Sequence, residues 1–486
     1  MTRPASASES SATSWLVALG VCLFVVYGGL AFLLPSLPRV ISAEPASSLI
    51  DRLGFWQTVV ALPLPRGDLV FAVIVVGTAI AAPAGYLAAF LIVRRRPVTR
   101  GALITVAGFG VVFWLAFVLA LPDASGDLYV YLAFQRVWVL HQANPYLVPP
   151  ASFRDDPILL YADSNWMHMV TPYAPVWTYL DVGLGKLLGG DILLGVLSQR
   201  LLFFVSDLAS LALIWKILGR LHPAQRLTGL ILFAWNPVVV SKATEHTESV
   251  MVALMLLGVC WASCHRDRLA VLSLTLSTLV KLVTAPLLAS YLLSEWFRGR
   301  RTPAVWAVAL ALIVVGLAFA PVWTGWEMLW RLTKDPMSTT YGGQFSGRRL
   351  AVAPGLFALI VWASWRGRGN LPAQLRGWCL IMLWFSVFLA PRGLIYYLVT
   401  LCGVVAIVDS IWIVAAVISF SCGSWLSFML FDQGRGLASG WSVLDRLIQY
   451  GPLAVVLLVF LWQRRGIIDP LALRANVAKW TLQRSP

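Results

Sequence analysis

The sequence predicts an all-α integral membrane protein with about 11 to 14 transmembrane helices. Hydrophobic residues make up 59% of the chain, charged residues make up 12%, and the mean hydropathy is +0.79. A water-soluble fold of this composition would expose far too much apolar surface. The apolar runs are about 15 to 25 residues long, which suits helices that cross a hydrocarbon core about 30 Å thick, and the alternating strands of a barrel are absent.

The positions of the basic residues predict the topology. The net charge of +15 is concentrated in short links between apolar runs, near residues 94–100, 216–226, 266–268, 298–301, 366–376 and 464–465. Cytoplasmic links of membrane proteins carry such an excess of lysine and arginine. We therefore expect a multi-pass protein of the cell membrane, the inner membrane of a bacterium, with no nucleic-acid partner.

The cysteines predict neither disulfides nor redox chemistry, because all six lie in apolar runs, where cysteine acts as a small hydrophobe. Cys260, Cys264 and His265 are spaced like metal ligands. They lie at a basic helix end without an obvious fourth ligand, so we expect no metal there.

The first elements lead to an outer loop. Residues 1–14 are rich in serine and alanine and are expected to be a disordered tail. The run 15–34 exceeds the core of a signal peptide, about 7 to 15 residues, and lacks a basic start, so we expect a retained helix. The next elements are an extracytoplasmic segment at 35–65, with a short interfacial helix at 49–56, and spans at 69–93 and 102–121.

Asp123 and Asp127 follow the third span, and the chain to residue 170 is expected to be soluble or interfacial. The stretch 171–194 is apolar but interrupted by prolines and charges. If it spanned the membrane, the basic link at 216–226 would face outward, so we expect this stretch to stay at the outer face. The next span, 197–218, carries Arg200 and Asp207 on one helix face.

The run 269–297 predicts two half-length helices that meet near Lys281. Lys281 and Pro286 interrupt its middle, and irregular backbone at membrane depth is tolerated only beside protein or a wet cavity. The remaining predicted elements are spans at 227–240, 249–264, 303–323, 351–365, 377–391, 393–408, 410–430 and 449–463, and a second outer loop at 324–350. We find no internal repeat, which disfavours a transporter.

Asp127 is a candidate general base, because a carboxylate near the membrane face is able to take a proton from an attacking hydroxyl. The pattern alone favours the other explanation, that Asp123 or Asp127 is the N-cap of the following helix. The segment Glu245-His246-Thr247-Glu248 suits metal binding, hydrogen bonds to a sugar, or simply a solvated helix start.

Lys281 is flanked by leucine and valine, and an unpaired ammonium at that depth costs about 3 kcal/mol or more. We therefore expect it to face a partner or an anionic ligand. Arg392 follows Pro391 and is open to the same interpretation, although a backbone carbonyl would also satisfy it.

The order of these features resembles the GT-C class of polyprenyl-phosphate-sugar-dependent glycosyltransferases, in its polytopic mannosyltransferase branch. The matching marks, over about residues 100–300, are Gly126-Asp127-Leu128-Tyr129-Val130-Tyr131, Asn144-Pro145-Tyr146, Tyr173-Ala174-Pro175, Trp235-Asn236-Pro237, Glu245-His246-Thr247-Glu248, and Lys281 with Pro286. Two departures are Ala174-Pro175, where the family has adjacent prolines, and the wider spacing of Lys281 and Pro286.

The resemblance implies a GT-C-like catalytic module at 15–300, a variable C-terminal module at 301–486, and Asp127 as the catalytic base. The implied substrate-binding residues are Tyr129, Tyr146, Tyr173, Glu245, His246, Glu248, Lys281 and Arg392. A member of this class moves a sugar, here expected to be mannose, from a polyprenyl-phosphate carrier to a hydroxyl of a glycolipid or glycan at the extracytoplasmic face, with inversion. Lys281, Arg392 and Arg348-Arg349 are available to the phosphate; no cofactor is required, and a divalent cation stays open.

A secondary transporter or a lipid-linked-sugar flippase is the alternative. A transporter would use Asp127, Arg200, Asp207 and Lys281 as intramembrane charges. The observation that separates these classes is whether Asp127, Glu245 and Lys281 converge in one outer cavity.

The topology is testable by cysteine labelling. Both termini should be cytoplasmic, and the loops at 122–170 and 324–350 should face outward, because the basic links alternate with them. Cysteines placed at Ser125 and Ser338 should react with an impermeant reagent in intact cells. Labelling of both sites only after permeabilisation would reverse the topology.

Overall fold

The computed structural model describes residues 7–33, 68–94, 98–120, 126–326, 328, 344–390, 395–433 and 442–465. Within these ranges the regular structure is helical and no strand occurs, which confirms the predicted all-α class. Predictions that concern Asp123, Arg392 and the segment 35–65 lie outside the described residues.

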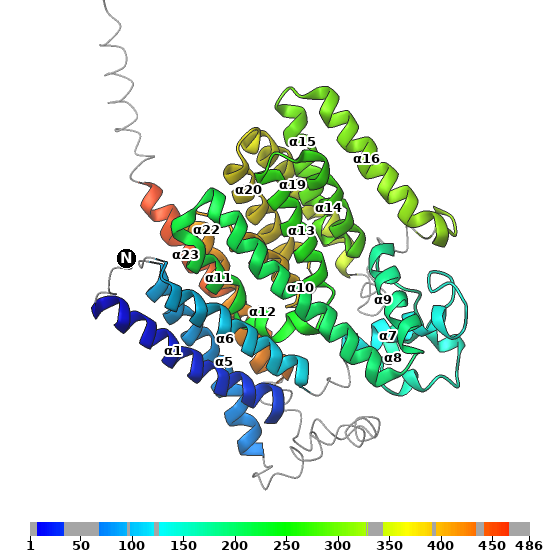
Figure 1. Cartoon of the computed structure of the whole chain (residues 1–486), viewed down its shortest axis with the longest axis horizontal. Coiled ribbons are helices and arrows are strands. Elements are labelled where there is room, and N and C mark those ends of the chain that lie inside the picture. The colour runs from blue at the N-terminus through cyan, green and yellow to red at the C-terminus, as the bar shows by residue number, and fades with distance from the viewer. Residues whose placement is uncertain are drawn as a thin grey trace, which may run out of the picture.

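Three helices near the N-terminus lie side by side (Figure 1). They are α1 (Ala7–Gly28, continued by a π-helical turn at Gly29–Leu33), α5 (Asp68–Val93) and α6 (Arg100–Leu119). Helix α1 begins inside the predicted tail 1–14, because alanine and glutamate extend a helix that the apolar span has already nucleated. The predicted spans at 69–93 and 102–121 match α5 and α6 closely.

A small group of helices lies at the end of the long helix α10 (Ile192–Leu221) (Figure 1). It contains α7 (Asp127–Val139), α8 (Ser164–Met167) and α9 (Pro175–Leu188), joined by 3-10 turns at Pro150–Ser152 and Pro157–Leu160. Arg136 ties the group together, since its Nε donates to Asp156 Oδ1 at 2.8 Å and its Nη1 donates to the Gly190 carbonyl. With 14 residues, α9 is too short to cross a membrane, as the sequence predicted.

The centre of the bundle contains two breaks. Helices α11 (Arg226–Ala234) and α12 (Pro237–Lys242) meet at a 48° bend, where the Asn236 side chain caps α12 by accepting from Val238 N at 3.0 Å. After α13 (Glu248–Ser263), α14 (Asp267–Val280) and α15 (Ala285–Phe297) are separated at Lys281, whose backbone is extended. This break confirms the two half-length helices predicted for 269–297.

The C-terminal helices match their predictions less closely. They are α16 (Arg301–Phe319), α19 (Gln344–Gly367), α20 (Leu371–Trp384), α21 (Tyr397–Val405), α22 (Ile411–Ser427) and α23 (Ser442–Arg465). Helix α19 begins inside the outer loop predicted at 324–350, and α21 has nine residues where a span was predicted at 393–408. Eight of the nine α21 residues are buried. The hydrophobicity of this segment is therefore explained by packing against other helices rather than by contact with lipid.

Eight described helices are long and apolar enough to cross a membrane, or nine if the bent α11–α12 pair forms one span. This is fewer than the 11 to 14 spans predicted. The difference has a physical cause: α13, α15 and the apolar part of α19 fall below the length of a full span.

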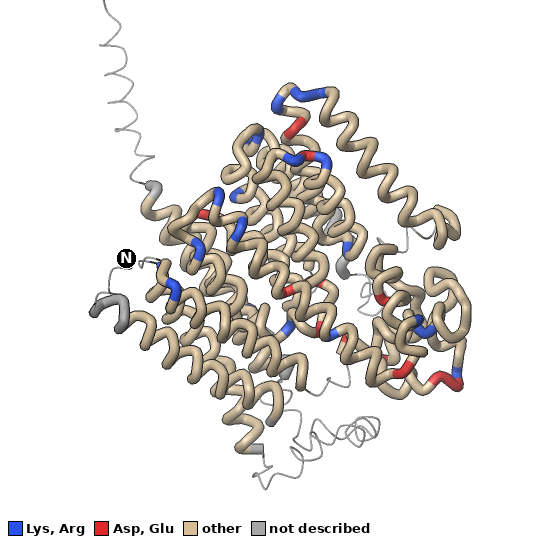
Figure 2. The backbone as a smooth tube through the Cα atoms, viewed as in Figure 1, with Lys and Arg blue, Asp and Glu red and all other residues tan. Residues whose placement is uncertain are grey.

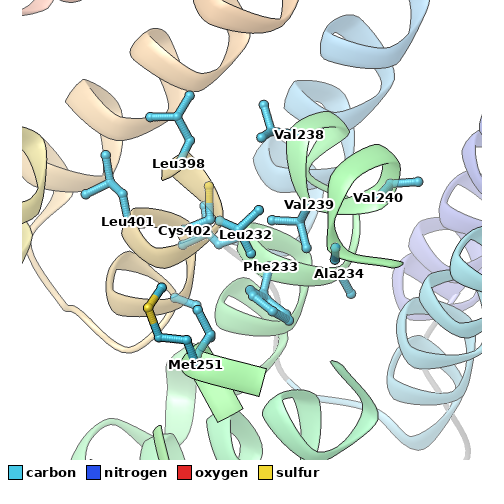
Figure 3. Close-up of a cluster of buried hydrophobic side chains, with 14 of the residues drawn as sticks. Leu232, Phe233, Ala234, Val238, Val239, Val240, Met251, Leu398, Leu401 and Cys402 are labelled. Atoms are coloured by element: carbon cyan, nitrogen blue, oxygen red, sulfur yellow. The ribbon is translucent and has the colours of Figure 1, made fainter. Parts of the chain in front are cut away.

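The core behind the α11–α12 bend is drawn in Figure 3. Side chains of Phe233, Val239, Met251 and Cys402, from α11, α12, α13 and α21, meet there and are fully buried. This packing fixes the bend relative to the first residues of α13 and α21. Those residues are close to the polar site described below.

Charged residues are unevenly distributed. In Figure 2 most lysines and arginines lie at helix ends along the upper and left side of the bundle, whereas aspartate and glutamate are more frequent in the middle and at the lower right. The basic links therefore share one side, as the topology prediction requires. That this side is cytoplasmic stays a prediction.

Close helix packing at Gly229 yields a test of the fold. A Cβ there would collide with the carbonyl oxygen of Ala406 and with Leu218 Cδ1, and the backbone carbonyl is unable to move aside. Gly229→Ala should lower the free energy of unfolding by about 1–3 kcal/mol. Gly316→Ala is the matched control, because its Cβ meets nothing within 4 Å. Thermal unfolding in detergent would measure both, and equal stabilities would contradict the packing.

Candidate functional site

Three segments that are separate in sequence bring four polar side chains together. Asp127 is the first residue of α7, and His246 lies between a 3-10 turn (Ala243–Glu245) and the start of α13. Glu248 is the first residue of α13, and Lys281 is the break between α14 and α15. All four lie where a helix begins or ends, so the backbone geometry of helix ends, rather than a continuous helix face, positions them.

The carboxylate of Asp127 is held by two side chains. His246 Nδ1 lies 3.1 Å from Asp127 Oδ2, and the Tyr131 hydroxyl, one turn further along α7, donates to the same oxygen at 3.4 Å. The N-cap of α7 is Gly126, which has no side-chain capping bond. Asp127 therefore does not cap the helix, which removes the alternative explanation for its position. Its side chain is 19% exposed, so one edge stays open.

The surroundings of Asp127 favour its ionised form. Burial alone would raise the pKa of this carboxyl, but the hydrogen bond and charge of His246, with the charges of Lys281 and Lys242, lower the pKa below its usual value. The position of Asp127 at the positive end of α7 also favours an anion there. The group is thus an acceptor at neutral pH, not a proton donor.

Lys281 has a protein partner. Its Nζ lies 2.5 Å from Glu248 Oε1, and the Glu248 side chain is completely buried while that of Lys281 is 14% exposed. This pair satisfies the requirement that an ammonium at this depth be neutralised. Both candidate residues were expected near the site, and the structure shows that they contact each other.

Two tyrosines at the start of α21 join the two pairs. The Tyr396 ring stacks on His246 with centroids 4.3 Å apart, and Lys281 Nζ lies 4.6 Å from the ring centroids of both Tyr396 and Tyr397. Such a cation–π contact stabilises a partly desolvated ammonium. Asp127, His246, Tyr396, Lys281 and Glu248 therefore form one continuous set of contacts, which we call the acid–imidazole–ammonium cluster.

Glu245 belongs to a neighbouring set of charges. Its carboxylate lies 3.3 Å from Arg200 Nη2 and 3.7 Å from Lys242 Nζ. Because Glu245 directly precedes His246, this second set is joined by the backbone to the acid–imidazole–ammonium cluster. The Glu245 carboxylate itself bonds Arg200 and Lys242, so the convergence of Asp127, Glu245 and Lys281 in one outer cavity stays a prediction.

The predicted aromatic residues are not equivalent in the structure. The Tyr173 ring packs edge-on against the Tyr131 ring, with centroids 5.0 Å apart, so it supports the tyrosine that donates to Asp127. Tyr129 is buried and stacks on Tyr161 at 5.4 Å. Tyr146 is buried in a separate small apolar cluster. Its hydroxyl donates to the Tyr173 carbonyl and is also hydrogen-bonded to Thr178 Oγ1, each at 2.9 Å. This geometry favours a structural role for Tyr146.

Sequence reasoning did not select four of the residues that complete the site. They are Tyr131, Tyr396, Tyr397 and Arg200. Tyr131 was part of a quoted motif, and the Tyr396-Tyr397 pair beside Arg392 was a usable signal, because adjacent aromatic residues beside a cation at a span end suit a cation–π site. Arg200 was considered only as an intramembrane charge.

Metal binding was left open by the sequence. In the part of the chain that the structure describes, no three or more histidine, cysteine, aspartate or glutamate side chains are grouped to hold a metal ion. In the Asp127–His246 pair, Oδ2 and Nδ1 are bonded to each other.

The bundle, with eight described helices long and apolar enough to cross a membrane, defines a multi-pass membrane protein. The family model described as "alpha-(1->6)-mannopyranosyltransferase, N-terminal domain" matches residues 26–298. The chain belongs to this family. The match contains Asp127, His246, Glu248 and Lys281, and it confirms the resemblance noted in the sequence.

Two relatives are similar over a shorter stretch. An alpha-(1->6)-mannopyranosyltransferase of Mycobacterium tuberculosis is 30% identical over 149 residues, which are 30% of this chain and 25% of the relative. Alpha-(1->6)-mannopyranosyltransferase A of Corynebacterium glutamicum is 28% identical over 145 residues, 29% of each chain. The matched stretch thus spans less than a third of these relatives. No solved structure matches the chain.

The buried pair Lys281–Glu248 yields a stability test. Removing one partner leaves the other charge buried and unpaired, so Lys281→Met or Glu248→Gln should each lower the free energy of unfolding by about 3–5 kcal/mol. The double variant should recover most of this loss, because no charge is then left without a partner. Thermal unfolding of the three variants would measure the coupling, and additive losses would show that the pair is not formed.

Proposed function

We propose that this protein transfers a mannosyl group from a polyprenyl-phosphate carrier to a hydroxyl of a glycolipid or glycan at the extracytoplasmic face of the membrane, with inversion at the anomeric carbon. The family match supports the sugar and the reaction class. The observation on which the proposal depends is the Asp127 carboxylate, which is ionised, partly exposed and not used as a helix cap.

In the proposed step, Asp127 accepts the proton of the attacking hydroxyl. Its Oδ2 is occupied by His246 and Tyr131, whereas Oδ1 has no hydrogen-bond partner among the described residues. The acceptor oxygen forms a bond to the anomeric carbon, the bond from that carbon to the phosphate oxygen breaks, and the electron pair leaves with the polyprenyl phosphate. A carboxylate of low pKa takes the proton once the forming bond has made the hydroxyl acidic.

His246 and Tyr131 hold the carboxylate in place. Both bonds go to one oxygen, which directs the other oxygen toward the open edge of the site. The stacked Tyr396 ring restricts rotation of the imidazole. A base held in this way needs no reorganisation when the substrate arrives, which is a large part of its catalytic value.

The donor phosphate requires positive charge near the same place. Lys281 is the described residue that best meets this requirement, since its ammonium is partly exposed and lies beside Tyr396 and Tyr397. Glu248 balances the charge of Lys281 when no donor is bound, and a phosphate would share that ammonium. Arg392, four residues before Tyr396, is the further candidate for this contact.

The direct test is the activity of Asp127→Asn. This change keeps the shape of the side chain and removes its basicity, so the transfer rate should fall by roughly 10²-fold or more. The matched control is Asp123→Asn, an acid four residues earlier in the same segment, which should retain most of the activity. Membranes with defined lipid-linked sugars would provide the assay, and near-parental transfer by Asp127→Asn would refute the assignment.

The pH dependence provides a second test. The midpoint of the acid limb of the rate profile should lie below the usual pKa of an aspartate, about 3.9, because the His246 bond holds the pKa of Asp127 below that value. In His246→Gln the burial remains while the favourable charge is lost, so the pKa of Asp127 rises and the acid limb of the rate profile moves to higher pH. An acid limb that is the same in both proteins would exclude this coupling.

A further inference from the structure

Arg200 joins the C-terminal end of α6 to the 3-10 turn that precedes His246. It lies in α10, and its side chain is only 1% exposed. Its Nη1 donates to the carbonyls of Val118, at 3.2 Å, and Ala120, and its Nη2 donates to Glu245 Oε1 at 3.3 Å. One guanidinium thus bonds two segments that are separated by more than 120 residues.

One partner of Arg200, Glu245, lies directly before His246, and the others precede Asp127 in the sequence. Val118 and Ala120 are at the C-terminal end of α6, and the chain reaches Asp127 seven residues after Ala120. Glu245 is the residue immediately before His246. The carbonyls at a helix C-terminus lack partners within the helix and carry partial negative charge, so they are suitable acceptors for a guanidinium.

The geometry requires an arginine. A guanidinium has five donors in a rigid plane and is able to bond acceptors on two sides, whereas the lysine ammonium is a single compact centre on a flexible stem. Glu245 balances the buried charge and is itself contacted by Lys242 at 3.7 Å. The result is a charged bridge from the end of α6 to the 3-10 turn that precedes His246.

We propose that Arg200 is a positioning residue, which holds His246 against Asp127 by anchoring the turn before His246 to the C-terminal end of α6. Its effect on the reaction rests on the proposed function, but its effect on the Asp127–His246 contact does not. When the bridge is lost, the turn that precedes His246 is free to shift, and the 3.1 Å contact between Asp127 and His246 lengthens.

Arg200→Lys is the informative variant, because a lysine keeps the positive charge but does not reproduce the planar guanidinium that bonds acceptors on two sides. The turnover rate should fall by about 10²-fold, the effect of a misplacement of about 1 Å, with little change in the KM for the donor. The matched control is Arg136→Lys. Arg136 is also buried and bonds a carboxylate and a carbonyl, those of Asp156 and Gly190, but it has no contact with Glu245 or His246. It should retain most of the turnover rate.

A spectroscopic measurement tests the bridge independently of activity. The chain has five histidines, so ¹⁵N-histidine labelling gives few ring signals, and Asp127→Asn identifies the one that is bonded to the carboxylate. That signal should be lost or shifted in Arg200→Lys and unchanged in Arg136→Lys. An unchanged signal in Arg200→Lys, or equal changes in both variants, would overturn the proposal. If the signals behave as expected while no variant alters sugar transfer, the bridge holds and the proposed function fails.

Discussion

The hydrogen bond between Asp127 and His246 is the interaction on which the site depends. It holds an anion in a largely apolar bundle without neutralising it, because an imidazole supplies a donor and the nearby ammonium groups supply positive charge. The surrounding helix breaks follow from this requirement. A continuous helix would leave Lys281 or Glu248 facing apolar neighbours, whereas helix ends allow these side chains to meet.

The arrangement also explains why so many residues at the site are aromatic. Tyr131, Tyr396 and Tyr397 place a hydroxyl or a ring face beside a charged group, and their apolar bodies pack against the bundle. The core of α11, α12, α13 and α21 in Figure 3 then fixes the helix starts from which these side chains project. Packing and charge pairing therefore support the same geometry.

Much of this fold is predictable from local sequence. The spans α5 and α6 follow from uninterrupted apolar runs, and the break at Lys281 follows from a charge and a nearby proline in the middle of one. Asp127, His246, Glu248 and Lys281 were all predicted as site residues. Their pairing was not predicted, because a choice between partners 33 residues apart, as for Lys281 and Glu248, or 119 apart, as for Asp127 and His246, depends on tertiary packing. Arg200 and Glu245 illustrate this limit, since nothing near either residue indicates the other. Likewise, the hydrophobicity of α21 reflects burial inside the protein and not a membrane crossing.

The central claim is that this site performs an inverting transfer from a lipid phosphate donor. The most direct measurement uses the purified chain in liposomes with a polyprenyl-phosphate-mannose of known anomeric configuration and a mannoside acceptor, followed by analysis of the product linkage. The account predicts a mannosylated acceptor of opposite anomeric configuration and one polyprenyl phosphate released for each sugar transferred. A product of retained configuration, or release of mannose to water without transfer to the acceptor, would contradict it.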